Sequence, residues 1–178
     1  NLLCGIGESE ILDDEIIIRK YPFEPSAVYP EKAIKANEIE AVSCESYPPF
    51  IILKNEIVFI SREYQETLKN FTEINGLQKI EETRNWNWLL EPYADTEYTE
   101  ETHLRLTALL EEHGISKNEI QVIRHEVEDQ MLKYNYDTML WDWVGLGLPD
   151  VLAAMRVKYS KEEFRDFYKR AMEIELRK

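Results

Sequence analysis

The histidines are the first residues to consider for metal binding or proton transfer, and the chain has only three of them, His103, His113 and His125. The segment HEVED (125–129) resembles half of the zinc-binding pattern HExxH, which places two histidines on one face of a helix. Position 129 is Asp129 rather than histidine, and a structural zinc site needs about four converging ligands. We therefore interpret the segment as a solvated helix face and predict no metal site.

The sequence offers no clear catalytic nucleophile. It lacks the GxSxG pattern of a serine hydrolase. Cys44 lies in a predicted strand beside Glu45, and a neighbouring carboxylate raises the pKa of a thiol rather than activating it. The 35 acidic residues make accidental carboxylate pairs common, so no pair can be singled out for catalysis. We predict no catalytic residue and no cofactor.

The segment WDWVGLGLPD (141–150) contains two glycines one residue apart, as phosphate-binding loops do. It lacks a third glycine, no strand is predicted before it, and no lysine follows for a phosphate. We interpret it as a corner between two helices, in which Gly145 ends the first helix in the left-handed conformation and Pro149 begins the second. Trp141 and Trp143 are expected to pack in the core.

The strongest functional signal is a segment in which acids and aromatic residues coincide. Residues 80–129 contain 13 acids and four bases, whereas residues 155–178 contain eight bases and five acids. An acidic surface speeds the encounter with a basic protein, and large rigid aromatic side chains are frequent anchors of interfaces. Burial in the core is the alternative for these tryptophans. The predicted partner-binding residues are Trp86, Trp88, Glu91, Tyr93, Asp95, Glu97, Glu100 and Glu101.

The composition limits the classes of partner. The formal net charge is −14, which disfavours nucleic acid and anionic membrane surfaces, because both are bound mainly through cationic residues. No apolar run approaches the roughly 18 residues of a transmembrane helix. The two cysteines fit no metal-binding spacing and indicate free thiols in a reducing compartment, so we expect a cytoplasmic protein. A signal sequence removed before Asn1 is an open alternative.

The elements that must position these residues change in kind along the chain. Short runs rich in Ile, Val and Phe at 15–21, 38–46, 49–55 and 56–61 predict an antiparallel sheet, with a hairpin turn near Lys54 and Asn55 and a proline-dotted loop at 21–33. Residues 61–74 carry a helical stripe that ends before Asn75 and Gly76. Residues 77–98 show no sustained period and are expected to form a linker or an ordered surface segment.

Three capped helical patterns follow residue 98. Thr99 opens the first pattern, and Ser116 with Glu119 and Ser160 with Glu163 form capping boxes for the other two. The predicted fold is therefore α+β: residues 1–76 form a small antiparallel sheet with a covering helix, residues 77–98 an acidic aromatic linker, and residues 99–178 a helical subdomain of three to four helices.

These observations lead to one main hypothesis of function and two alternatives. The main hypothesis is a non-enzymatic module that masks a basic protein partner, as immunity proteins and antitoxins do. The first alternative is a metal-dependent or carboxylate-based enzyme with a site between the two halves, using His125 with Glu126, Glu128 or Asp129. The second alternative is a subunit that self-associates through its aromatic patch, which would make the protein a homo-oligomer.

Overall fold

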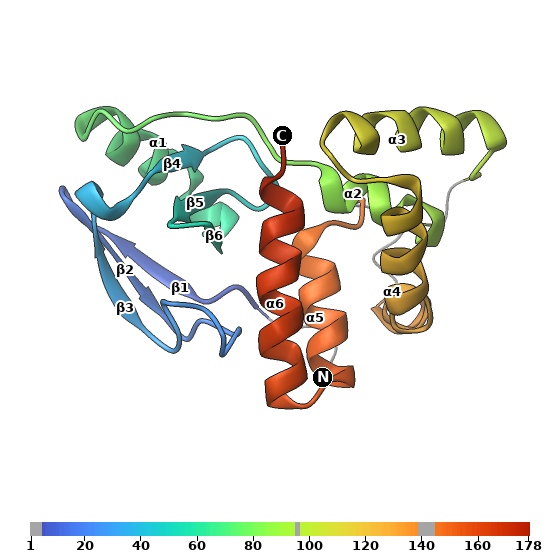
Figure 1. The fold of residues 1–178 in the computed structure, drawn as a ribbon. Coiled ribbons are helices and arrows are strands. Elements are labelled where there is room, and N and C mark those ends of the chain that lie inside the picture. The colour runs from blue at the N-terminus through green and yellow to red at the C-terminus, as the bar shows by residue number, and fades with distance from the viewer. Residues whose placement is uncertain (1–4, 95–96, 139–144) are drawn as a thin grey trace. The chain divides into compact units, whose positions relative to one another are not determined.

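The structure, a computed structural model, describes residues 5–94, 97–138 and 145–178 and has an α+β fold, as predicted (Figure 1). The chain divides into two compact units, a β-rich unit that ends at Thr83 and a helical unit from Arg84 to Lys178. Each unit is described by itself. In the part of the chain that the structure describes, no helix combines the length and hydrophobicity needed to cross a membrane.

The β-rich unit contains two antiparallel sheets of three strands each, where one sheet was expected. The first sheet has the order β1-β2-β3, and the second has the order β4-β5-β6. The sequence analysis missed β1 and β3, which are short and rich in charged residues. The strands are β1 (Glu8–Ile11), β2 (Glu15–Arg19), β3 (Lys32–Lys35), β4 (Ala41–Ser43), β5 (Phe50–Leu53) and β6 (Glu56–Phe59).

The predicted hairpin between β5 and β6 is confirmed. Leu53 pairs with Glu56, so Lys54 and Asn55 form a two-residue loop. Both loop residues have positive φ angles, 37° and 63°, as the tightest hairpin turns require. Asparagine tolerates this conformation better than most residues, which is the reason the turn could be located from the sequence.

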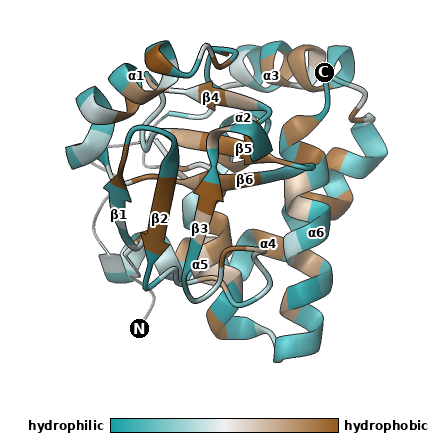
Figure 2. Ribbon diagram, turned by 90° about the vertical axis from the view of Figure 1, so that its left-hand side faces the viewer, coloured by the Kyte–Doolittle hydropathy of each residue, from teal (hydrophilic) through white to brown (hydrophobic). Residues whose placement is uncertain are grey.

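The core of the β-rich unit is built from one face of the first sheet, from apolar residues of the second sheet and from aromatic residues of the loop that follows β2. Ile16, Ile18 and Ile34 are fully buried on that face, and β2 is the most uniformly apolar of the three strands in Figure 2. Tyr21 and Phe23 are also buried, and the Tyr21 hydroxyl accepts a hydrogen bond from the Phe59 backbone N–H of the second sheet at 3.1 Å. This loop therefore fastens the two sheets to each other.

The predicted helix at 61–74 begins with a 3₁₀ turn at Arg62–Tyr64 and continues as α1 (Gln65–Ile74). It ends before Gly76, which has a φ angle of 59°, as predicted. Leu68 and Phe71 are buried, but Ile74 was expected in the same stripe and is 70% exposed. Ile74 is the last residue of the helix.

The expected linker at 77–98 is divided between the two units. Residues 77–83 belong to the β-rich unit, where the Val42 backbone N–H donates to the Gln78 carbonyl at 2.8 Å and the Ile80 N–H donates to the Val42 carbonyl at 2.9 Å. This stretch thus covers the free edge of β4. Residues Asn85–Leu90 form a short helix of the helical unit.

The described residues of the helical unit form five α-helices, and α5 and α6 run side by side in Figure 1. The predicted caps are confirmed at Thr99 and Ser160, whose side chains accept from the backbone N–H groups of Thr102 and Glu163. The helices are α2 (Asn85–Leu90), α3 (Glu100–Glu112), α4 (Lys117–Thr138), α5 (Leu148–Lys158) and α6 (Lys161–Leu176).

The corner before α5 agrees only in part with its prediction. Pro149 lies in the first turn of α5, as predicted, but Gly145 does not have a positive φ angle, so it does not form a left-handed helix end. Gly147 is the constrained glycine, because a Cβ atom there would lie 3.1 Å from the side-chain nitrogen of Asn87. Trp141 and Trp143 lie outside the described residues.

Gly7, just before β1, provides a test of the β-rich unit. Its φ angle is 86°, and a Cβ atom would lie 2.8 Å from the Arg19 carbonyl oxygen. Gly7→Ala should therefore lower the free energy of unfolding by about 1–3 kcal/mol in chemical denaturation. Gly5→Ala is the matched control, since its Cβ would approach only the Gly7 nitrogen, at 4.0 Å. Equal losses of unfolding free energy in the two variants would contradict the close approach of the Gly7 backbone to the Arg19 carbonyl.

Candidate functional site

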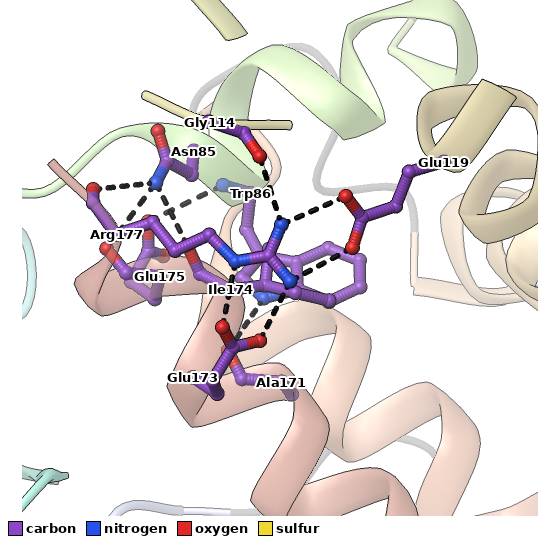
Figure 3. Close-up of polar contacts among 9 residues, drawn as sticks. All are labelled: Asn85, Trp86, Gly114, Glu119, Ala171, Glu173, Ile174, Glu175 and Arg177. Carbon is purple, nitrogen blue, oxygen red and sulfur yellow. Dashed lines mark hydrogen bonds and ion pairs between the residues drawn. The ribbon is translucent and has the colours of Figure 1, made fainter. Parts of the chain in front are cut away.

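Two helix ends of the helical unit cap each other through Asn85 and Glu175 (Figure 3). The Asn85 side-chain amide donates to the carbonyls of Ile174, Glu175 and Arg177 at 2.8, 3.5 and 3.1 Å, which satisfies the open carbonyls at the end of α6. In return, the Glu175 carboxylate accepts from the Trp86 backbone N–H at the start of α2, at 3.3 Å. We call this pair the Asn85–Glu175 junction.

Glu175 is a buried acid without a cation at its carboxylate. Its side chain is 3% exposed, and burial raises its pKa to about 7, an effect that hydrogen bonds from the backbone of Trp86 and Asn85 only partly offset. Burial disfavours the charged form because a low-dielectric interior solvates a carboxylate poorly. The junction is thus a polar contact with a titratable group at its centre.

Two further residues connect the junction to α3 and α4. The Asn85 side-chain oxygen accepts from the His113 ring Nδ1 at 2.8 Å, at the end of α3. The Arg177 guanidinium donates to both carboxylate oxygens of Glu119 at 2.8 Å, and these hydrogen bonds hold the pKa of Glu119 below its usual range. Arg177 also donates to the Glu173 carboxylate. The start of α4 is therefore fixed to the end of α6.

The structure places two of the predicted aromatic anchors inside the helical unit. Trp86 has no exposed surface; its indole N–H donates to the Ala171 carbonyl at 2.9 Å, and its ring lies 6.1 Å from that of Phe167. Tyr93 is also buried, its hydroxyl donates to the Arg124 carbonyl at 2.9 Å, and burial raises its pKa to about 12. Neither side chain is available to a partner in this conformation, because both fill the core.

The residues in the middle of the predicted patch are partly exposed. Trp88 is half-buried, with its ring centroid 5.2 Å from the His113 ring in an edge-on arrangement. Trp86 and Trp88 do not share a face as an extended segment would predict, since residues 85–90 form a helix. Glu91 is half-buried and begins the 3₁₀ turn Glu91–Tyr93. Asp95 lies outside the described residues.

The remaining predicted acids are exposed and close together in the chain. Glu97 precedes α3, and Glu100 and Glu101 form its first turn. Their negative charge is favourable at a helix N-terminus, which gives them a structural role in addition to any role in binding. The structure thus places Glu97, Glu100 and Glu101 of the predicted patch on the surface and Trp86 and Tyr93 in the core.

The acids of α3 and α4 differ from the bases of α5 and α6 in their pairing. We call the residues from Glu97 to Thr138 the α3–α4 arm. Within the described residues, eight exposed acids of this arm form no ion pair. They are Glu97, Glu100, Glu101, Glu111, Glu112, Glu128, Asp129 and Asp137.

On the basic side of the unit, the arginines Arg170 and Arg177 are bound to carboxylates. Arg170 pairs with Glu126 at 2.7 Å, and Arg177 pairs with Glu119 and Glu173. These two arginines are therefore paired with acids of α4 and α6 and do not neutralise the other exposed acids of the arm. The arm therefore presents a negative surface that the rest of the unit does not neutralise.

The arm also exposes apolar side chains that the sequence analysis did not select. Val122, Leu132 and Tyr136 on α4 are 59%, 50% and 82% exposed. Leu104 on α3 is 62% exposed. The sequence pattern marks Ile120, Ile123, Val127 and Met131 as one face of this helix, and these residues are buried. The exposed apolar residues on its other side are shown by the structure.

The metal-dependent alternative receives no support from the described residues. No group of three or more His, Cys, Asp or Glu side chains in ranges 5–94, 97–138 and 145–178 is arranged to hold a metal ion. His125 is exposed, while Glu126 is turned to Arg170 and to the Tyr159 hydroxyl, which together lower its pKa. The HEVED segment therefore has one acid already engaged in structure.

Comparisons with known proteins add no functional assignment. No protein-family model matches the chain, and searches of curated proteins and of solved structures find no match. The functional argument therefore depends on the geometry of this chain.

The junction predicts an unusual dependence of stability on pH. Because the pKa of Glu175 is about 7 in the folded chain against 4.5 as its ordinary value, its contribution is fully present below pH 4.5 and is lost as the pH rises through 7. The free energy of unfolding should fall by about 2–3 kcal/mol between pH 5 and pH 8 from this group. Chemical denaturation across this range measures it.

Two variants separate Glu175 from other groups. Glu175→Gln should remove the fall between pH 5 and pH 8, since glutamine keeps a hydrogen-bond acceptor without the charge. Asp166→Asn, at an exposed position of the same helix, should leave the fall unchanged. A fall that persists in Glu175→Gln would assign the pH dependence to another group, such as the buried Asp150, whose pKa burial also raises.

Proposed function

We propose that this chain is a protein-binding module whose α3–α4 arm captures a basic protein and masks its basic surface. The observation that carries the proposal is the set of eight exposed acids on the arm that form no ion pair with any described residue. Surface acids that are not neutralised within their own molecule attract a basic partner over a distance of about 8–10 Å at physiological salt.

The rigidity of the arm also supports this role. Arg124 donates to the carbonyls of Trp88 and Leu89 at the end of α2, and Arg177 fixes the start of α4 through Glu119. A surface that is held in place before binding loses less conformational entropy when a partner docks. The buried Trp86 contributes to binding in this indirect way, as part of the core that supports the arm.

The proposal differs from the sequence-based hypothesis in its choice of anchors. Trp86 and Tyr93 are removed from the interface, whereas Glu97, Glu100 and Glu101 are retained. The aromatic and apolar contacts come instead from exposed residues of α4. Masking a basic partner remains the function that best fits a chain with a net charge of −14 and a rigid acidic surface.

The partner can be sought with the protein immobilised in a lysate of its source organism at low ionic strength. We expect one basic protein to elute at intermediate salt, and Glu100→Lys/Glu101→Lys should bind it with an association rate lowered by about tenfold or more at low salt. The difference should shrink at high salt, because the attraction is screened. Surface plasmon resonance with the purified partner measures both rates.

The matched control is Glu162→Lys/Asp166→Lys on α6. Glu162 also lies in the first turn of a helix, so its reversal has a similar effect on helix stability as the reversal of Glu100 or Glu101. The control should leave the association rate within about twofold of the unmodified chain, since it changes net charge by the same amount away from the arm. Equal losses in both variants would show that net charge, not the arm, attracts the partner.

A further inference from the structure

The α4 helix carries exposed apolar side chains outside the face that is covered within the helical unit. Ile120, Ile123, Val127 and Met131 are buried against the unit. On the other side Val122, Leu132 and Tyr136 are exposed. A helix of a single folded unit needs only one apolar stripe, so the second stripe requires an explanation.

The exposed residues follow the spacing of a helix–helix interface. Val122, His125, Asp129, Leu132 and Tyr136 are separated by three, four, three and four residues. At 100° per residue these five positions lie within about 80° of the helix surface, and together they span about 21 Å. This is the arrangement by which one helix packs along another, with side chains of each inserted between those of its partner. We call these five residues the outer stripe of α4.

The charged residues on and beside the outer stripe indicate which kind of partner fits it. Glu128 and Asp129 face solvent, and neither forms an ion pair with a described residue. Lys133 is the exposed base of the same stretch. A second copy of the chain would bring Glu128 and Asp129 of both helices toward the centre of the interface, where like charges repel. A partner helix that carries lysine or arginine beside its apolar stripe would instead pair with them.

We propose that the outer stripe of α4 is the docking site for a basic amphipathic helix of the partner protein. This inference rests on the proposed function and adds the element that binds and the kind of segment that it takes. Val122, Leu132 and Tyr136 contact the apolar stripe of the incoming helix, and Glu128 with Asp129 pair with its flanking bases. Tyr136, the most exposed of the three, supplies the large aromatic contact that the buried Trp86 and Tyr93 cannot.

The probe for this site is a synthetic peptide of about 14 leucines and lysines, a length that matches the stripe, with leucines at three- and four-residue spacing. A peptide of the same composition with leucine and lysine alternating is the control, since it cannot place its leucines on one helix face. Binding is followed by ¹⁵N NMR shifts of the full chain. We expect saturable binding of the helical peptide, with the largest shifts along the outer stripe.

Two pairs of substitutions test the contacts. Leu132→Ser/Tyr136→Ser should raise the dissociation constant by about tenfold or more, because it removes the apolar area that binding buries. Its matched control is Ile74→Ser, which removes another exposed apolar side chain in the β-rich unit and should leave the dissociation constant unchanged. Glu128→Gln/Asp129→Asn should weaken binding mainly at low salt.

Each outcome has a distinct meaning. Equal affinity for both peptides, or shifts confined to Glu97, Glu100 and Glu101, would overturn the outer stripe and leave the acidic attraction of the proposed function standing. If the variant Leu132→Ser/Tyr136→Ser binds the basic protein identified from the lysate as tightly as the unmodified chain does, the outer stripe is excluded as the docking site. Sedimentation of the unmodified chain as a dimer that Leu132→Ser/Tyr136→Ser disrupts would make a second copy the occupant and overturn the basic helix. Failure of the proposed function itself is seen separately, in the unchanged association rate of Glu100→Lys/Glu101→Lys.

Discussion

The helical unit depends on the reciprocal capping of α2 and α6. Both helices would otherwise end with open backbone groups in the interior, and each open group costs roughly 1–3 kcal/mol when it is buried without a partner. Asn85 and Glu175 satisfy the two ends with one side chain each, over a separation of about 90 residues in the chain. The contact places the short α2 against the last turn of α6, so that the Trp86 ring enters the core beside Phe167. The polar junction and the aromatic core therefore depend on each other.

The same junction links the core of the unit to its charged surface. His113 bonds the side chain of Asn85, and Arg177, two residues after Glu175, pairs with Glu119 at the start of α4. These contacts fix the end of α3 and the start of α4 to the buried end of α6. Pairing also decides which acids remain on the surface: Glu119 and Glu126 are used within the unit, whereas Glu128 and Asp129 are left to solvent. The acidic character of the arm is thus a result of local pairing as well as of composition.

Most of the elements could be predicted from the sequence because their signals are local. The hairpin at Lys54 and Asn55, the caps at Thr99 and Ser160 and the buried stripe of α4 each depend on residues within a few positions of one another. The strands β1 and β3 were missed because they are short and rich in charged residues, and β3 pairs with β2 only across the long proline-dotted loop. The helix α2 was missed for a related reason: six residues are too few to show a period, and its ends are capped by Glu175 and Arg124, which lie far away in the sequence.

The exposure of the proposed patch could be predicted from the sequence only in part. Charge is a better guide to exposure than aromatic character, since an unpaired carboxylate is costly to bury, and Glu97, Glu100 and Glu101 are on the surface, whereas Glu175 is the buried exception. An aromatic side chain gives no such guide, because Trp and Tyr stabilise a core and an interface by the same burial of apolar area. Trp86 lies next to the buried polar junction and is in the core, whereas Tyr136 lies near the end of the long helix α4 and is exposed. An interface on this chain is therefore better sought where apolar side chains remain exposed next to unpaired charge than where aromatic residues are dense in the sequence.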